Sequence, residues 1–165
     1  MAIANRTVRE GVVGGLIAAG AVAVWFLILD LVAGRPFGTP RQLGESVASL
    51  FGGTGGASPT LYVLGYTVFH ILAFGVAGMV VSAVVNKAEE EPSLLWGLLI
   101  LFVAFELAWY GLTAILSQGE AYGTLAWYQV MVANLIAAAA MGFYLYRRHP
   151  ALAGRASASV VGSGA

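Results

Sequence analysis

Apolar residues along the chain gather in four long runs that are separated by shorter, more polar segments. The runs cover about residues 11–32, 61–85, 94–116 and 124–146. About 20 consecutive apolar residues in a helix are enough to cross the roughly 30 Å hydrocarbon layer of a bilayer. The pattern therefore predicts four membrane-spanning helices.

The first run has a second interpretation. Arg6 and Arg9 precede it, which is also the arrangement of a cleavable secretory signal. The bulky residues 25–29 extend the apolar stretch beyond the usual length of a signal core. We therefore expect an uncleaved first helix.

A helical pattern also occurs in the polar segment 34–59 between the first two spans. Thr39 followed by Pro40 is typical of an N-cap and a first helical position. Apolar residues then recur at helical spacing between positions 43 and 51. We expect a short amphipathic helix here, either lying in the membrane interface or packed as a lid over the bundle.

Composition agrees with a membrane protein and excludes several other classes. Of the 165 residues, 59% are hydrophobic and only 10% are charged, whereas soluble domains have about 25% charged residues. This excludes a soluble enzyme, a disordered chain and a nucleic-acid binder. Cysteine is absent, which excludes disulfides and thiolate metal sites. The predicted fold class is all-α: an integral membrane four-helix bundle in a lipid bilayer, with a short amphipathic helix between the first two spans.

Basic residues predict the orientation. With four spans, both termini and the 86–92 loop lie on one side of the membrane. That side carries six basic residues against two on the other: Arg6, Arg9, Lys87, Arg147, Arg148 and Arg155 against Arg35 and Arg41. The positive-inside rule then places both termini in the cytoplasm. Residues 151–165, which are small and polar, are predicted to form a disordered cytoplasmic tail.

Three ionisable residues fall within the spans, where such groups are costly and mark candidate functional sites: Asp30, His70 and Glu106. His70 lies 16 residues before Asn86 and Glu106 lies 14 residues after Pro92. Both are thus about 21–24 Å from the same loop and level with each other. The predicted polar cluster comprises Asp30, Tyr66, His70, Glu106, Tyr110 and Asn134.

The cluster has more than one interpretation. His70 and Glu106 could form a pair that transports protons, ions or a small solute, because histidine changes charge near neutral pH. Alternatively, they hydrogen-bond to each other and only specify how the helices pair. Asp30, near the interface, could instead cap the loop or pair with Arg35.

Cofactor chemistry is limited by the two histidines, His70 and His149, of which His149 is predicted to lie in the tail. One chain therefore does not supply two core ligands for a haem. Haem, pigment or quinone binding at His70 stays as a third hypothesis. One histidine and one carboxylate are too few for a metal site, so we predict no metal and no resident cofactor.

A resemblance adds to this picture. It rests on the pattern D-x3-G-R-P-F-x-T-P-x2-L-G from Asp30 to Gly44, on Tyr66-Thr67-x-x-His70 and on Phe105-Glu106. Over about residues 10–146 the chain resembles a group of small uncharacterised four-span bacterial membrane proteins. The resemblance implies a bacterial inner-membrane location and implies no activity.

The sequence contains no HExxH motif, phosphate-binding glycine loop or nucleophile elbow in a suitable context. We therefore predict a small non-enzymatic inner-membrane protein, as a homo-oligomer or an accessory subunit of a larger membrane complex. Transport at His70 and Glu106, and haem, pigment or quinone binding at His70, are the alternatives.

Overall fold

The computed structural model of the chain describes residues 2–53, 56–116 and 127–150, and these residues are helical or in turns, with no strand among them. Five helices follow in order: α1 (Ala2–Val32), α2 (Gly38–Leu50), α3 (Pro59–Ala88), α4 (Leu94–Leu116) and α5 (Trp127–Arg148). The helices α1, α3 and α5 contain stretches long and apolar enough to cross a membrane, and α4 contains the apolar segment Leu94–Ala104. The all-α class predicted from the sequence is thus confirmed, and three of the described helices could span a membrane.

The observed boundaries agree with the predicted spans, with some differences. The helix α1 begins nine residues before the predicted position 11, and α3 extends past both predicted ends. Pro92 lies in the turn before α4, where its carbonyl accepts a hydrogen bond from Leu95 N–H. The predicted start of the fourth span at 124 and the predicted tail 151–165 lie outside the described residues.

Close backbone contact joins α1 to α3. A side chain at Gly15 of α1 would overlap the carbonyl of Phe74, and one at Gly78 of α3 would overlap the carbonyl of Gly11. Gly11 and Gly15 are four residues apart, the spacing at which small residues let membrane helices approach closely. The absence of side chains at these positions therefore sets the distance between the two helices.

The helix α5 packs against α1 on another side. The indole N–H of Trp25 in α1 donates to the backbone carbonyl of Gln129 at 3.1 Å. The buried core contains small and aliphatic residues together with one aromatic residue: Ala18, Val22, Phe26, Val85, Ala133, Ala137, Met141 and Leu145. The helix α1 thus contacts α2, α3 and α5, and α3 contacts all four other helices.

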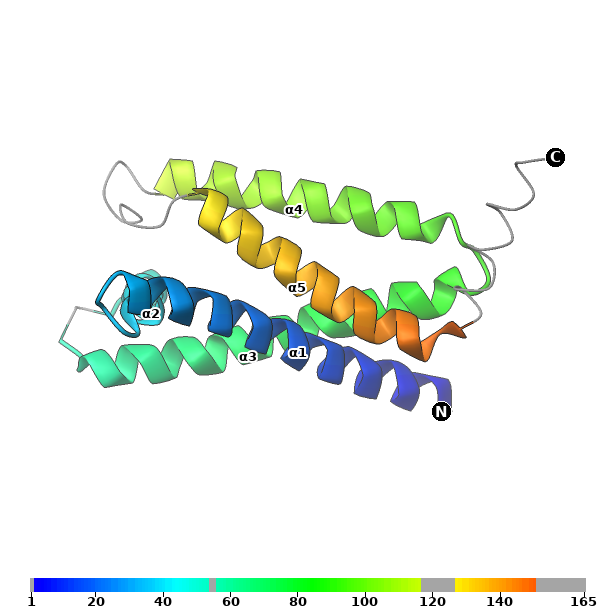
Figure 1. Cartoon of the computed structure of the whole chain (residues 1–165), viewed down its shortest axis with the longest axis horizontal. Helices are drawn as coiled ribbons and strands as arrows, with labels where there is room; N and C mark the ends of the chain where they lie inside the picture. The colour runs from blue at the N-terminus through cyan, green and yellow to red at the C-terminus, as the bar shows by residue number, and fades with distance from the viewer. Residues whose placement is uncertain (1, 54–55, 117–126, 151–165) are drawn as a thin grey trace.

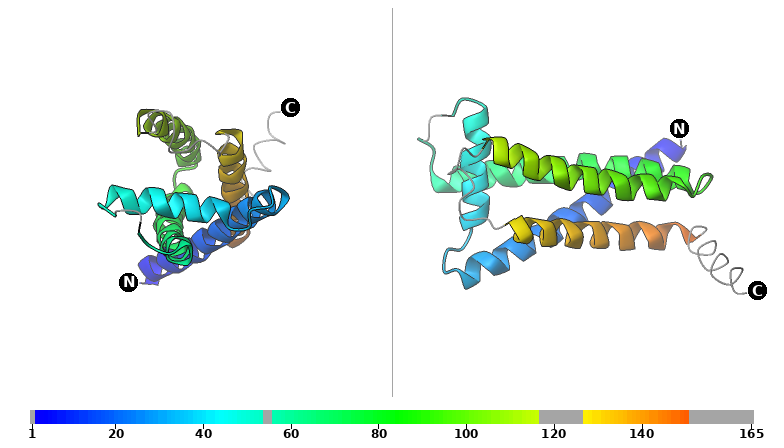
Figure 2. Two further views of the ribbon diagram at one scale, coloured as in Figure 1. Left: turned by 90° about the vertical axis from the view of Figure 1, so that its left-hand side faces the viewer. Right: turned by 90° about the horizontal axis from the view of Figure 1, so that it is seen from above.

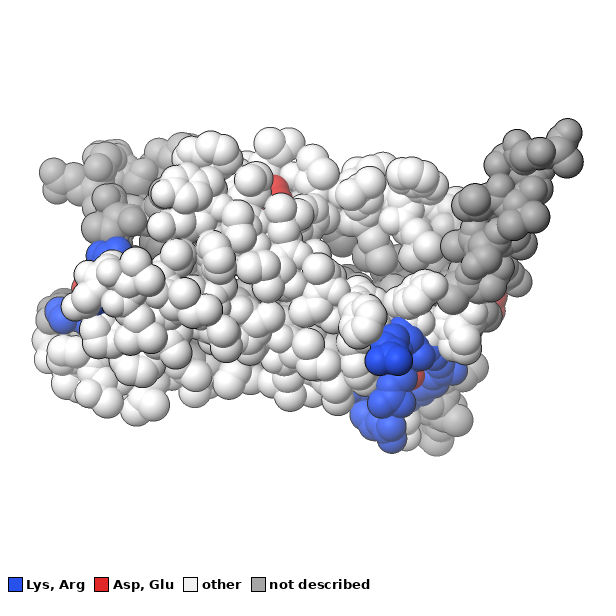
Figure 3. Space-filling model, in the orientation of Figure 1, with Lys and Arg blue, Asp and Glu red and all other residues white. Residues whose placement is uncertain are grey.

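The outer surface is apolar between the two ends of the molecule. Large side chains of α4 are exposed: Leu95, Trp96, Leu99, Ile100, Leu101, Val103 and Leu107. Figure 3 shows that lysine and arginine gather at the two ends, with an almost uncharged surface between them. A contiguous apolar exterior of this size is unfavourable in water and is what a lipid environment requires.

The short helix α2 lies across one end of the bundle, while the other helices extend along its length (Figures 1 and 2). We refer to this as the α2 end, and to the end that holds the start of α1 and the end of α5 as the opposite end. Gly44 of α2 packs directly on the backbone of Tyr62 in α3. The charged residues Arg41 and Glu45 of α2 are exposed. This packing is the one expected of a lid.

Candidate functional site

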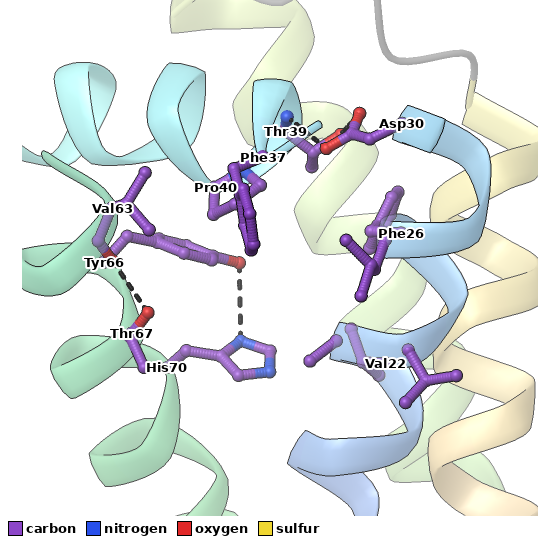
Figure 4. Close-up of a pocket in the computed structure, with 13 residues that line it drawn as sticks. Val22, Phe26, Asp30, Phe37, Thr39, Pro40, Val63, Tyr66, Thr67 and His70 are labelled. Atoms are coloured by element: carbon purple, nitrogen blue, oxygen red, sulfur yellow. Dashed lines mark hydrogen bonds between the residues drawn. The ribbon is translucent and has the colours of Figure 1, made fainter. Parts of the chain in front are cut away.

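A cavity of about 230 Å³ lies between α1, α2 and α3 near the α2 end. Its wall is mainly aliphatic and aromatic, and it includes the polar residues Asp30, Thr39, Tyr66, Thr67 and His70. Figure 4 shows Asp30 and Thr39 on one side of this pocket and the Tyr66 hydroxyl above the His70 ring on the other. Three of the six predicted site residues thus line one cavity.

Asp30 holds the beginning of α2. The residue is only 1% exposed. It accepts one hydrogen bond from Thr39 N–H at 2.7 Å and another from the Thr39 hydroxyl at 2.8 Å. A negative charge is favourable there because the first N–H groups of a helix point toward it.

Of the two alternatives given for Asp30, a cap or a pair with Arg35, the structure shows a cap. The assignment of Thr39 as the N-cap is wrong. The N-cap is Phe37, which has a left-handed backbone with φ of 63° and forms no side-chain cap. Thr39 is instead the residue whose N–H is capped. In the described residues Asp30 has no ion pair with Arg35, whose backbone N–H donates to the Asp30 carbonyl.

His70 has a partner on each ring nitrogen. Nε2 lies 3.3 Å from the carbonyl oxygen of Ala19 in α1, and Nδ1 lies 3.4 Å from the Tyr66 hydroxyl. A carbonyl only accepts, so Nε2 carries the hydrogen, and in the neutral ring Nδ1 then accepts from Tyr66. Binding of a haem or pigment metal at either nitrogen would displace one of these partners, which counts against that hypothesis.

Glu106 forms a separate buried group with α5. One carboxylate oxygen accepts from the Asn134 side-chain amide at 2.6 Å. The other is buried and has no hydrogen-bond partner among the described residues. Tyr110, one turn further along α4, interacts electrostatically with Glu106 and donates to the carbonyl of Trp127 at 3.2 Å. Glu106 and Asn134, both members of the predicted cluster, are thus in direct contact.

The six predicted residues form three groups: Asp30 with Thr39, Tyr66 with His70, and Glu106 with Asn134 and Tyr110. In the part of the chain that the structure describes, no hydrogen bond joins His70 to Glu106. His70 and Glu106, the two residues of the hypothetical transport pair, therefore have different partners on different helices.

A further buried group at the opposite end was not predicted. His149 is fully buried, and the expectation that it lies in the tail is wrong. Its Nδ1 lies 2.6 Å from a carboxylate oxygen of Glu89, and its Nε2 lies 3.2 Å from one of Glu10. Arg6 donates to the other Glu10 oxygen at 3.0 Å and to the Arg148 carbonyl at 3.2 Å.

One signal in the sequence points to this group. Arg6 and Glu10 are four residues apart, the spacing of neighbours on a helix face. The four-span topology also brings the chain start, the 86–92 loop and the end of the last span to the same side. Together, these features place Glu10, Glu89 and His149 at one end.

Within the described residues, no group of three or more histidine and acidic side chains is arranged to hold a metal ion. No protein-family model, curated protein or solved structure matches the chain. The functional argument therefore rests on the geometry of the pocket and of the buried polar groups.

Proposed function

We propose that the chain is a non-enzymatic four-span protein of a bacterial inner membrane that binds a lipophilic small molecule in the pocket beneath α2. The observation that carries this proposal is the pocket itself. It is mainly apolar, has a few polar groups facing it from three helices, and has a volume of about 230 Å³. Small-molecule sites are typically apolar concavities with a few well-placed polar groups.

The four-span arrangement is supported by the length of α4, Leu94–Leu116, whose 23 residues match those of a span. The orientation is supported by the excess of basic residues at the opposite end. Arg147 and Arg148 lie over the rings of Phe143 and Tyr144, with distances of 5.4 and 5.5 Å to the ring centroids. Basic and aromatic side chains are typical of a membrane interface. In this orientation the pocket lies in the outer half of the bilayer.

We also propose that the chain is related to the small four-span bacterial membrane proteins that it resembles. We further propose that it associates into a homo-oligomer or a larger complex. The mass of the protein extracted in gentle detergent tests association. A lone monomer under these conditions would contradict the subunit hypothesis.

Filling the pocket tests the proposed binding. The variant Ala23→Phe adds a ring at a pocket-lining position of α1. Its control Ala138→Phe adds the same ring on the exposed side of α5. We expect mass spectrometry of gently purified protein to find a bound lipophilic molecule in the wild type and the control, and to find it lost in Ala23→Phe. Equal retention in all three proteins would contradict the proposal.

A second candidate function, proton or ion transport, is supported by one observation: the buried oxygen of Glu106 that has no hydrogen-bond partner among the described residues. An ionisable group inside a span is a candidate transport residue. Flux into liposomes would then be lost in Glu106→Gln and kept in Glu90→Gln, which changes an exposed acid. Absence of flux in the wild type, or equal flux in both variants, would exclude this candidate.

A further inference from the structure

The threonine hydroxyls of the pocket point their hydrogens away from the cavity. The Thr39 hydroxyl donates to Asp30 at 2.8 Å, and the Thr67 hydroxyl donates to the carbonyl of Val63, one turn earlier in α3, at 2.7 Å. Each hydroxyl has one hydrogen to donate and two lone pairs that accept. Both hydroxyls therefore present only acceptor capacity to a ligand.

Tyr66 and His70 also present only hydrogen-bond acceptors to the cavity. The carbonyl of Ala19 fixes the hydrogen of His70 on Nε2, so the Tyr66 hydroxyl donates to Nδ1. Neither residue then has a hydrogen to spare for the cavity. The Tyr66 oxygen still has a free lone pair, and in Figure 4 it lies inside the pocket between Phe37 and His70.

At the beginning of α2, which also lines the pocket, the N–H groups of the first helical residues are already bonded within the chain. The Thr39 N–H is bound to Asp30, the Gly38 N–H to the carbonyl of Arg35, and the Arg41 N–H to the carbonyl of Phe37. Pro40 has no N–H. The usual property of a helix start, free N–H groups that bind an anion, is thus already used within the chain.

The polar side chains of this pocket only accept hydrogen bonds, so the pocket favours a ligand that donates one. A ketone, ester or ether oxygen placed there would face lone pairs and lose its own hydrogen bonds to water, which is costly in an apolar site. A hydroxyl would find an acceptor at Tyr66, Thr67 or Thr39. Building on the proposed binding function, we propose that the ligand is an amphipathic molecule whose polar head is a neutral hydroxyl, such as a phenol, a hydroquinone or an alcohol.

The surroundings of Asp30 indicate that the polar head of the ligand is uncharged. Its carboxylate charge is already balanced by two hydrogen bonds and by the start of α2. An ammonium head would bring three more hydrogens into a mainly apolar wall, where an incompletely paired charge is strongly unfavourable. A single hydroxyl requires only one acceptor.

Three probes that share an alkyl chain test this inference: 4-nonylphenol, its methyl ether 4-nonylanisole, and 4-nonylbenzylamine. Binding of each radiolabelled probe is measured with the full chain in lipid nanodiscs, after subtraction of empty nanodiscs. We expect the phenol to bind about tenfold more tightly than the ether, the effect of one buried hydrogen bond and one avoided unpaired oxygen. Equal binding of phenol and ether, or tighter binding of the amine, would overturn the inference while leaving the pocket as a binding site. No binding of any probe would overturn the proposed function as well.

Two variants separate the hydrogen-bond explanation from simple differences in hydrophobicity. His70→Leu frees the Tyr66 hydroxyl to donate into the pocket, so the preference for phenol over ether should fall to near unity. Tyr66→Phe removes one acceptor but exposes Nδ1 of His70 as another, so the preference should persist. The wild-type ratio remains decisive even if a variant fails to fold. An unchanged ratio in a folded His70→Leu would overturn the inference.

Discussion

The two ends of the molecule each contain a histidine that is bonded on both ring nitrogens, yet the two sites are built differently. His149, at the opposite end, is fully buried between the carboxylates of Glu89 and Glu10, at 2.6 and 3.2 Å. His70, near the α2 end, has longer hydrogen bonds of 3.3 and 3.4 Å to neutral groups and borders a cavity. The same residue type thus joins three segments at one end of the bundle and lines a cavity at the other.

The connections between segments differ in the same way. At the opposite end, the Arg6, Glu10, Glu89 and His149 side chains join α1, the turn after α3 and the end of α5. At the α2 end, Thr39 of α2 donates two hydrogen bonds to the Asp30 side chain of α1, both at one point of the short helix. We therefore expect ligand entry to move α2 rather than the opposite end.

The largest effect should come from His149→Ala. The substitution removes the shared partner of two carboxylates, and Glu10 stays buried without it, so we expect a loss of about 3–5 kcal/mol in the free energy of unfolding. His70→Ala serves as the matched variant and should cost about 1–2 kcal/mol, because its bonds are longer and join neutral groups. Unfolding in mixed detergent micelles measures both values. Equal losses would contradict the proposed difference between the ends.

Asp30→Ala should have the next largest effect, about 1–3 kcal/mol, because it leaves the Thr39 N–H and hydroxyl unpaired. The effect should be confined to α2. The chain contains no cysteine, so a single cysteine introduced at Ala48 in α2 reports its opening through the rate of thiol labelling. We expect faster labelling there and an unchanged rate at a cysteine placed at the buried Ala88.

Thr39→Val sharpens the same test. It removes the hydroxyl bond and keeps the bond from the Thr39 N–H to Asp30. The labelling rate at Ala48 should fall between those of the wild type and Asp30→Ala. A rate as high as that of Asp30→Ala would mean that the N–H bond contributes little.

The fold was more accessible from sequence than the site. The span at 94–116 coincides with α4 because the end of an apolar run sets where a helix leaves the bilayer. The rotation of each helix about its axis is set by contacts such as Gly15 with Phe74. Helices that are apolar on all sides carry little periodicity that reveals this rotation. The division of the predicted cluster into three groups was therefore not predictable.

Two local errors have similar causes. Thr39-Pro40 matches an N-cap signature, but Asp30, nine residues earlier, provides the cap from another helix. His149 follows two arginines that mark the end of a span, and its burial depends on Glu10 and Glu89, which are distant in sequence. Local patterns carry no information about such distant partners, whereas Asp30 and His70 were identified because ionisable residues are rare within spans.

The smallest expected change in unfolding free energy comes from two arginine–glutamate pairs with the same spacing. Arg6 with Glu10 and Arg41 with Glu45 are both four residues apart and both 3.0 Å long, but the acidic side chain is 7% exposed in the first pair and 45% in the second. Arg41→Ala should cost only about 0.3–0.5 kcal/mol, as for an exposed helical pair, and the loss should vanish at high salt. Arg6→Ala should cost about 1 kcal/mol and keep most of this loss in salt, because Glu10 is shielded from water and also contacts His149. The free energy of unfolding of each variant is measured at 20 mM and at 0.5 M salt. The screening length is about fivefold shorter at the higher concentration. If the two pairs respond equally to salt, burial does not distinguish the two ends, and the closed character of the opposite end would have to come from apolar packing alone.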